Sequence, residues 1–413
     1  MIPNDSNIKV LFLSYNGLLE PILSSQAIPY LKGLAKEGYE FILVTYEKKR
    51  DIEKTEKARI AHIREELKSH GIEWIYLRYH KNPRLISTLF DIFTGIIYCL
   101  YLIPAKKIKI VHVRGITPGS IMIVLSKFFK VKVLFDMRGR LAEEMAAGGL
   151  WSEGSLQYKL VKFAEARLLR SADAVTVLTK RHLEYNKKLP YLKDKGTVME
   201  IIPCCVDINK FNFDIKEAAD FKKTLGLENK FILMYLGKIG TFYFMERMLD
   251  FFGELLKTVP DAIFVILTPY EAPELYEKAL SRGIDKDNIR VVVGLKFEDM
   301  PKYLQIADAG IFFINSYNKM GSSPIKMGEF LACGVPVITN PGVGDTEDIV
   351  KRERIGILVA HFQGNHYKEA VRDILDLKKT GDELRDRCRD AARRCLSLED
   401  GISKYKKIYE ELS

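Results

Sequence analysis

The chain has 413 residues, a length that excludes a single ordinary hydrophobic core and indicates two domains. Hydrophobic residues make up 47% and charged residues 29%, which are ordinary shares for a folded soluble protein. The net charge of +10 and the pI of about 9.0 indicate an anionic partner. Nucleic acid, a phosphorylated small molecule and an acidic membrane surface are the candidates.

The six cysteines form no CxxC pair and no compact cluster with histidine. We therefore expect reduced thiols in a cytosolic protein, without a structural zinc site. The N-terminus has no basic segment before its apolar run, and that run is too short for a signal peptide. It is typical of a first β-strand.

Strand and helix patterns alternate along the first half of the chain. Short apolar or β-branched runs occur at Val10–Ser14, Phe41–Thr45, Trp74–Leu77, Ile110–Val113, Val131–Asp136 and Ala174–Leu178. Helical patterns such as Ser24–Gly38 and Ile52–His70 lie between them. Nearly continuous apolar strands separated by helices indicate a parallel sheet covered on both faces.

One segment, Leu85–Ile103, approaches the length of a membrane-spanning helix. It contains Asp91, and the simplest interpretation is a largely buried helix packed on the sheet. The alternative is a helix whose apolar face enters a bilayer surface. Lys106, Lys107 and Lys109 follow it directly, and basic residues beside an apolar helix suit anionic lipid.

The strand pattern begins again after the stretch Met199–Phe213. Its runs are Phe231–Leu236, Ala262–Leu267, Ile289–Val293, Ala309–Ile314, Val335–Thr339 and Gly356–Val359. We predict an α/β protein with two doubly wound, Rossmann-like domains, residues 1–205 and 206–380, facing each other across a cleft. The charged helices of residues 381–413 are expected to pack back toward the N-terminal domain. Ligands of open parallel sheets bind beyond the carboxyl ends of the strands.

Polar residues follow three strand ends in the first half: Asn16 and Gly17, then His112 with Arg114, then Asp136 with Arg138 and Arg140. Taken alone, His112 is best interpreted as a core histidine. Charged side chains at strand ends, in contrast, usually meet a ligand or each other.

In the second half, Gly237 and Lys238 end a strand, where glycine lets the backbone approach a ligand and lysine can neutralise phosphate. A helix is predicted to begin near Ser323 or Pro324, with a serine cap and N–H groups able to hold a phosphate. Lys326 opposes the dipole of that first turn, and Glu329 shares its face. From residue types alone, an anion site and a surface ion pair are equally good interpretations.

Other nucleotide and metal motifs do not fit. No GxGxxG is followed by an acidic residue at the right distance, and the P-loop pattern is absent, which argues against a dinucleotide dehydrogenase. Asp285-Lys286-Asp287 resembles a metal-binding DxD motif, but its polar loop indicates a solvated turn.

The sequence resembles the GT-B glycosyltransferases, specifically the retaining nucleotide-sugar transferases of glycosyltransferase family 4, over essentially its whole length. The most specific match is GSSPIKMGEFLACGVPVIT, residues 321–339, which is similar to the family's nucleotide-sugar motif. Supporting matches are Tyr235–Lys238, the junction Ile201–Asp207, Ile306–Ile314 and the strand IVHVRG.

The resemblance implies roles for individual residues. In the donor site, Glu329 would hold the ribose and Lys238 the diphosphate. Ser322 and Ser323 would present backbone amides to the diphosphate, and Gly237 would also contact the donor. Lys238, Lys326 and Arg138 would act in catalysis. The N-terminal domain would bind the acceptor, with Asn16, Gly17, His112, Arg114 and Asp136 as candidates. No metal or other cofactor is expected.

Three positions depart from the family pattern. Gly321 stands where the family has a glutamate that contacts the donor sugar, and Arg138 stands near a position where many relatives have histidine. The family's second phosphate lysine falls near Tyr243, so we expect Lys326 to supply that charge.

The predicted reaction is hexosyl transfer with retention from a nucleotide diphosphate sugar, a UDP-sugar in preference to a GDP-sugar, to a glycan or lipid-linked acceptor. The setting would be bacterial or archaeal surface polysaccharide or glycoconjugate synthesis, in the cytoplasm and at the inner face of the membrane; nucleic acid would not be a partner. The alternatives are a GT-B sugar-nucleotide epimerase or hydrolase, and a catalytically degenerate nucleotide-sugar-binding or membrane-adaptor protein, which Gly321 and Arg138 keep open.

Overall fold

The computed structural model describes residues 8–192, 196–240, 242–315 and 319–413. These residues form two compact units. Unit 1 consists of Met1–Pro203 together with Leu398–Ser413, and unit 2 of Cys204–Ser397. Each unit has its own parallel sheet and its own hydrophobic core. Two Rossmann-like α/β units are the architecture that the alternating strand and helix patterns predict.

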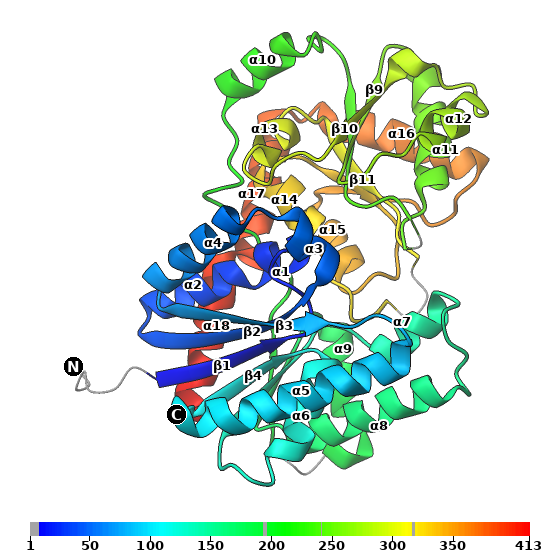
Figure 1. Ribbon diagram of the computed structural model, residues 1–413. Coiled ribbons are helices and arrows are strands. Elements are labelled where there is room, and N and C mark those ends of the chain that lie inside the picture. The colour runs from blue at the N-terminus through cyan, green and yellow to red at the C-terminus, as the bar shows by residue number, and fades with distance from the viewer. Residues whose placement is uncertain (1–7, 193–195, 241, 316–318) are drawn as a thin grey trace. The chain divides into compact units, whose positions relative to one another are not determined.

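Unit 1 is built on a seven-stranded parallel sheet with the order β3-β2-β1-β4-β5-β6-β7 (Figure 1). The strands are β1 (Ile8–Ser14), β2 (Tyr39–Lys48), β3 (Ile72–Tyr79), β4 (Ile110–Arg114), β5 (Lys132–Met137), β6 (Ala174–Val177) and β7 (Val198–Ile201). The strand order reverses between β1 and β4, which pair in parallel with Ser14 opposite Arg114. Such a reversal opens a crevice at the carboxyl edge of the sheet.

The helices of unit 1 cover both faces of this sheet. They are α1 (Pro21–Gln26), α2 (Ile28–Lys36), α3 (Lys49–Lys54), α4 (Lys57–Ser69), α5 (Arg84–Ala105), α6 (Ile116–Leu125), α7 (Leu141–Ala147), α8 (Leu156–Ser171), α9 (Lys180–Lys187), the short η1 (Pro190–Leu192) and α18 (Leu398–Leu412). Helices α5, α6 and α8 pack side by side on one face, and α2 and α18 pack together on the other (Figure 1). Alternation along β4 serves both layers, since Val111 and Val113 join the core under α5 and α6 while His112 reaches α18.

Unit 2 has a six-stranded parallel sheet with the order β10-β9-β8-β11-β12-β13. Its strands are β8 (Ile232–Leu236), β9 (Ile263–Thr268), β10 (Ile289–Val293), β11 (Ala309–Phe312), β12 (Val337–Thr339) and β13 (Gly356–Leu358). Its helices are α10 (Ile215–Thr224), α11 (Met245–Thr258), α12 (Glu274–Leu280), η2 (Lys286–Asn288), α13 (Met300–Leu304), α14 (Ile325–Ala332), α15 (Thr346–Glu353), α16 (Gly364–Lys378) and α17 (Asp382–Leu396). The Asp285–Asp287 segment is exposed at η2, in keeping with a solvated turn.

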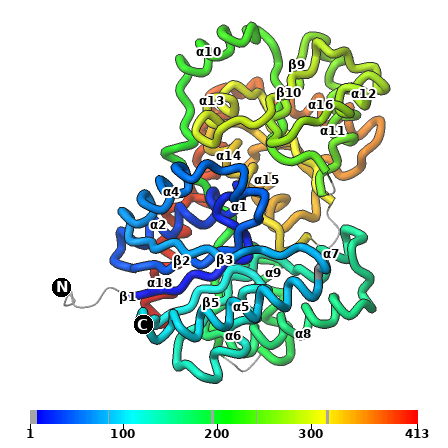
Figure 2. The backbone as a smooth tube through the Cα atoms, in the orientation of Figure 1, coloured from blue at the N-terminus to red at the C-terminus, as the bar shows by residue number. Residues whose placement is uncertain are grey.

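The end of the chain differs from the sequence-based division at residue 381. Helix α17 packs on α14 and α15 in unit 2, whereas α18 packs on α2 in unit 1. Figure 2 shows the red trace of α18 among the blue elements of unit 1. The helix breaks at Ser397, whose φ of −71° and ψ of 134° are extended, so the last two helices fall into different units.

Three expectations about helices are wrong. The helix expected at Ile52–His70 is divided into α3 and α4, because the backbone at Thr55 and Glu56 has extended ψ angles of 124° and 138°. The single helix expected at Ser24–Gly38 is interrupted at Ala27, because Pro29 lies in the first turn of α2 and cannot continue a preceding helix. The helix α5 is not largely buried, since only 33% of its most apolar stretch lies inside the structure. In the described part of the chain, α5 is the one helix long and apolar enough to cross a membrane by length and composition.

The packing of α14 on β11 is tight at Gly310, where an added Cβ atom would lie 2.6 Å from the buried ring of Phe330. We predict that Gly310→Ala lowers the free energy of unfolding by about 1–3 kcal/mol through overpacking. Gly253→Ala is the matched control: it lies in α11, its Cβ would come no closer than 3.9 Å to Ile284, and helix propensity favours alanine there. Urea unfolding that gives equal midpoints for the two variants would contradict the packing argument.

Candidate functional site

The segment that leads into α14 carries the strongest sequence motif. The helix begins at Ile325, and its cap residue is Pro324, with no side-chain cap hydrogen bond. The predicted serine cap is therefore wrong. The hydroxyl of Ser323 instead accepts a hydrogen bond from the N–H of Cys204 (3.1 Å), and the N–H of Ser322 donates to the carbonyl of Lys319 (3.0 Å). The first turn of α14 thus keeps backbone N–H groups that no side chain caps, as an anion site requires.

Lys326 and Glu329 lie on this helix, and each side chain is only 5% exposed. No described residue accepts a hydrogen bond from the buried Nζ of Lys326. The interpretation as a surface ion pair is therefore wrong for these two residues. Burial lowers the pKa of Lys326 to about 7, partly offset by the nearby Glu329, and burial raises the pKa of Glu329 to about 7, partly offset by Lys326.

Two tyrosines surround the Lys326 ammonium group. Its Nζ lies 3.6 Å from the ring centroid of Tyr243 and 4.4 Å from that of Tyr235. Aromatic faces stabilise a cation without neutralising its charge. Gly237 closes the third side: a Cβ atom there would lie 2.8 Å from Nζ, and its φ of 134° is one that other residues rarely adopt. The positive φ therefore favours the glycine predicted at this strand end, and its lack of a Cβ atom lets the backbone pass close to Lys326.

Lys238 is exposed next to this buried charge. Its carbonyl accepts a hydrogen bond from the Tyr235 hydroxyl (2.6 Å), which fixes the loop after β8 over the same tyrosine that contacts Lys326. The Nζ of Lys238 lies 5.7 Å from the ring centroid of Tyr270. The structure therefore brings the predicted donor residues Gly237, Lys238 and Lys326 to one end of the sheet.

The loops after β11 and β12 are joined by Asn340. Its side-chain oxygen accepts from the N–H of Ile314 (2.8 Å), and its amide donates to the carbonyl of the same residue (3.0 Å). The N–H of Gly344 donates to the carbonyl of Lys319 (2.9 Å). Lys319, which the sequence did not single out, is itself buried with Nζ 4.3 Å from the Phe242 ring. Three lysines thus collect where the sheet of unit 2 ends.

The predicted acceptor residues of unit 1 form a separate polar cluster around Asp136. This carboxylate is 1% exposed, and it accepts hydrogen bonds from Arg114 (3.0 Å) and from the Thr176 hydroxyl (3.0 Å). Arg138 is 3.5 Å away, and Nε2 of His112 is 3.8 Å away. Burial alone would raise the pKa of Asp136, but Arg138, His112 and Arg114 together hold it well below its usual range.

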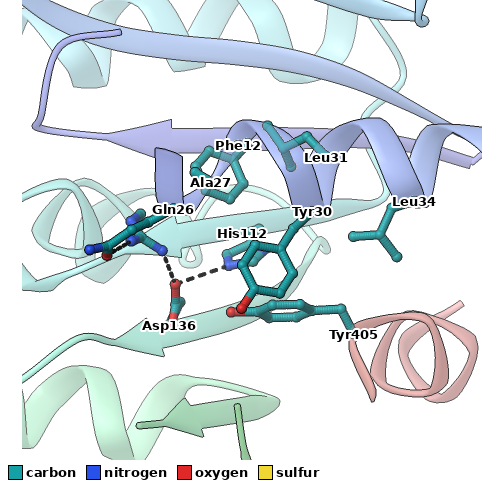
Figure 3. A pocket seen from close by; sticks show the side chains of 10 residues that line it. Phe12, Gln26, Ala27, Tyr30, Leu31, Leu34, His112, Asp136 and Tyr405 are labelled. Carbon is teal, nitrogen blue, oxygen red and sulfur yellow. Dashed lines mark hydrogen bonds and ion pairs between the residues drawn. The ribbon is translucent and has the colours of Figure 1, made fainter. Parts of the chain in front are cut away.

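His112 is buried, and burial lowers its pKa. Its Nδ1 is 2.7 Å from the hydroxyl of Tyr409 in α18, and its ring lies 5.3 Å from that of Tyr405. Figure 3 shows His112 and Tyr405 beside a cavity of about 10 Å³, roughly the space of one water molecule. His112 and Asp136 therefore have the burial expected of core residues, and among the cluster's members Arg138 keeps more exposure, with 15% of its side chain open to solvent.

Asn16 and Gly17 lie at the end of β1, outside this cluster. Asn16 is exposed, while Gly17 lies directly against the carboxylate of Glu47. Glu47 is fully buried and accepts hydrogen bonds from the N–H groups of Leu18 (2.5 Å) and Leu19 (3.2 Å). Sequence reasoning missed this carboxylate, which lies two residues beyond the predicted strand Phe41–Thr45, near the end of β2.

Comparisons with known proteins agree with this architecture. Residues 29–189 match the model of the family described as glycosyl transferase 4-like domain, and residues 216–395 match glycosyl transferases group 1. A sucrose-phosphate synthase from Thermosynechococcus elongatus has a TM-score of 0.74 at 16% identity, covering 98% of this chain and 99% of that one. HepE of Anabaena in complex with UDP-glucose has a TM-score of 0.71 at 11% identity, with 98% and 100% covered.

Among curated proteins, the chain is similar to the alpha-D-kanosaminyltransferase of Streptomyces kanamyceticus, with 24% identity over 234 residues. That match covers 56% of this chain and 58% of the relative's length. Two parallel sheets of this kind, each matched by its own transferase model, define the GT-B class. The chain belongs to the GT-B glycosyltransferases of the family 4-like, group 1 type.

We predict that the buried Asp136 carboxylate stabilises the folded protein. Asp136→Asn leaves Arg114 and Arg138 without this buried counter-charge, so the free energy of unfolding should fall by about 3–5 kcal/mol near neutral pH. Because the folded-state pKa of Asp136 is lowered, its stabilising contribution is present above pH ~4 and is lost as the pH falls below that value. Denaturant unfolding at several pH values measures both effects.

Glu37→Gln is the matched control, because it breaks an exposed pair with Lys406 whose worth should be at most about 1 kcal/mol. A cost for Asp136→Asn no larger than that of the control would show that the buried cluster carries no net stability.

The double variant Lys326→Met/Glu329→Gln removes both buried titratable groups, so we expect it to change how the stability of the protein depends on pH. Folded Glu329 keeps a proton between pH ~4.3 and 7 that the unfolded chain releases, so stability falls with rising pH there. Unfolded Lys326 keeps a proton between pH 7 and ~10.4 that the folded chain releases, so stability then rises. The double variant should therefore be more stable than the native chain, by about 1–3 kcal/mol near pH 7 and by less at pH 5 and pH 9. Calorimetry of both proteins without ligand measures the difference, and a less stable variant at pH 7 would contradict it.

Proposed function

We propose that the protein transfers a sugar from a nucleotide diphosphate sugar to an acceptor hydroxyl, with retention of the anomeric configuration. The observation that carries the proposal is the buried ammonium group of Lys326, which has no hydrogen-bond acceptor among the described residues. A buried cation costs folding free energy unless something pairs with it, so its retention indicates an anionic ligand. Its position against Tyr243 supports the expectation that it replaces the family's second phosphate lysine.

In this proposal unit 2 holds the donor. Lys326, Lys238 and the backbone N–H groups of the first turn of α14 stabilise the charge that develops on the departing diphosphate. Glu329 accepts hydrogen bonds from the ribose hydroxyls, which requires its ionised form. Because preorganised cations and dipoles stabilise the leaving group, we propose that the reaction needs no metal, no other cofactor and no covalent enzyme nucleophile.

For the donor we propose a UDP-linked hexose in preference to a GDP-linked one. The support is the likeness in fold to HepE, which has been solved in complex with UDP and with UDP-glucose. Gly321 is buried at the position where the family glutamate would contact the sugar. We propose that backbone groups beside Gly321 take over that contact, so sugar selectivity rests on shape more than on a carboxylate.

We propose that unit 1 holds a glycan or lipid-linked acceptor, in the synthesis of a bacterial or archaeal surface polysaccharide or glycoconjugate. Arg138 and Asn16, which keep solvent exposure at the ends of β5 and β1, are the acceptor-side residues best placed to contact a substrate. The proposed location is the cytoplasm, at the inner face of the membrane.

A second candidate function is a sugar-nucleotide epimerase or hydrolase. It is favoured by the absence of a carboxylate at Gly321 and by the fold of a putative UDP-N-acetylglucosamine 2-epimerase from Listeria monocytogenes, which has a TM-score of 0.63 at 14% identity. Incubation with a UDP-sugar labelled in the sugar separates the two functions. The incubation is run with and without a lipid extract as the source of acceptor. Label recovered in the lipid fraction supports transfer. Label recovered as free sugar or as an epimer in the absence of the extract supports the second candidate.

The donor site gives a sharp prediction for binding. Lys326→Met should weaken UDP binding by about 30-fold or more, since loss of one charge-assisted contact to the diphosphate costs roughly 2–4 kcal/mol. Glu329→Gln should weaken UDP binding less, because it removes contacts to the ribose alone. Titration calorimetry with UDP, GDP and UDP-glucose measures these affinities and the base preference together.

Lys216→Gln is the control, because Lys216 is an exposed lysine of unit 2 outside the site. In the native protein, affinity for UDP should decrease as the pH rises above 7, because loss of the Lys326 proton weakens the diphosphate contact more than ionisation of Glu329 strengthens the ribose contact, and Lys326→Met should abolish this decrease. Native-like affinity in the Lys326 and Glu329 variants would exclude the assigned donor site.

A further inference from the structure

The helix α5 of unit 1 has two sharply different faces. Its sheet-facing stripe is buried and includes Asp91, Gly95 and Cys99. Its opposite stripe is open to solvent and almost entirely apolar: Ile86, Leu89, Phe90, Phe93, Ile97, Tyr98, Leu100 and Tyr101 are each 42–70% exposed. A helix on a water-exposed surface normally carries polar side chains on its outer face. The outer face of α5 instead exposes a large apolar area, which favours contact with something other than water.

The apolar surface continues beyond α5. Helix α6 packs between α5 and α8, so the outer faces of α5 and α8 belong to the same layer (Figure 1). Val124 and Phe128 at the end of α6 are 39% and 70% exposed, and Leu156, Leu160 and Phe163 of α8 are 61%, 41% and 64% exposed. We name these side chains and those of the outer stripe of α5 the apolar surface.

The exposed charges on the segments that form the apolar surface are basic, while acidic residues lie beyond these segments, at Glu153, at Asp173 paired with Lys132, and at Glu73 paired with Lys106. Within residues 85–109, 116–132 and 156–171, all of them described, the acidic residues are Asp91 and Glu165, and both are buried. The exposed charged residues of these stretches are all basic: Lys107, Lys109, Lys127, Lys130, Lys132, Lys159, Arg167 and Arg170. An apolar face with a basic border is complementary to anionic headgroups over hydrocarbon.

The fold determines how such a helix could meet a bilayer. The carboxylate of Asp91 accepts hydrogen bonds from Tyr15 (2.8 Å) and from the N–H of His80 (3.1 Å), and it lies 2.6 Å from Nδ1 of the His80 ring. These contacts tie the inner face of α5 to the ends of β1 and β3. The helix therefore cannot leave the sheet to span a membrane without breaking a buried network, and only its outer face is available.

We infer that unit 1 docks on an anionic lipid bilayer through the apolar surface, with α5 and α8 lying in the plane of the membrane interface. The inference deepens the proposed function and rests on it for the expectation of a membrane-linked acceptor; the docking itself needs no donor. A second copy of the chain is the less favoured occupant, because two copies would bring two basic borders together, and like charges oppose that contact.

The test is sedimentation of the full chain with vesicles of phosphatidylcholine and phosphatidylglycerol, in parallel with vesicles of phosphatidylcholine alone. The native protein should sediment with the anionic vesicles at low salt and less so at high salt. The triple variant Phe93→Ser/Tyr101→Ser/Phe128→Ser should lower the partition coefficient by at least about tenfold, since three large apolar side chains no longer enter the interface. Lys127→Gln/Lys130→Gln should lower it by about fivefold per lysine.

Matched controls come from unit 2. Ile215, Tyr270 and Leu280 are 65%, 55% and 48% exposed, so their triple serine variant removes comparable apolar area away from the surface, and Lys216→Gln/Lys223→Gln removes two exposed charges. Both should bind vesicles like the native protein.

Three outcomes would overturn the docking: a native protein that stays in solution, an apolar-surface variant that binds as before, or a native dimer that the same substitutions convert to a monomer. UDP binding, measured in the same preparations, should be unchanged in the apolar-surface variants. Loss of vesicle binding and failure of the donor site are therefore separate results.

Discussion

The burial of the Lys326 ammonium group is the constraint on which the end of the unit 2 sheet depends. An ammonium group taken out of water without a hydrogen-bond acceptor is costly, and the protein reduces that cost with aromatic faces and a lowered pKa. A hydrogen-bonded carboxylate placed beside the lysine would have stabilised the fold more. Among the described residues no hydrogen-bond acceptor satisfies this charge, which is the pattern of a site that exchanges stability for affinity toward an anion.

The neighbouring features follow from that one side chain. The positive φ of Gly237 favours glycine at the point where the chain passes Nζ of Lys326, and the Tyr235 hydroxyl holds the carbonyl of Lys238 in the same loop. Asn340 then fixes the end of β11 by bonding both the N–H and the carbonyl of Ile314. Loops that would otherwise be free to move are thus held at the carboxyl edge of the sheet, as preorganised electrostatic stabilisation requires.

Sequence patterns predicted every strand except β7, because apolar β-branched runs report burial directly, and the family resemblance assigned Gly237, Lys238 and Lys326 to one donor site. They could not decide whether Lys326 and Glu329 were buried, since residues three apart share a helix face whichever way it points. They also misjudged α5, because apolarity does not distinguish a helix buried all round from one with an apolar face exposed. The partner of His112, Tyr409, lies almost 300 positions away, and no local pattern could reveal it.

The connection from α17 to α18 explains why the polar cluster around Asp136 needs a helix that follows unit 2 in the sequence. After α17 the backbone turns at Ser397, and α18 brings Tyr405 and Tyr409 against His112, where they exclude water from Asp136. Without them, Asp136 and its arginines would be solvated, and the carboxylate would be held less firmly by charges in a higher dielectric. Unit 1 is therefore complete only when the end of the chain has been made, so the arrangement of the residues after β4 and β5 depends on a segment that follows the whole of unit 2.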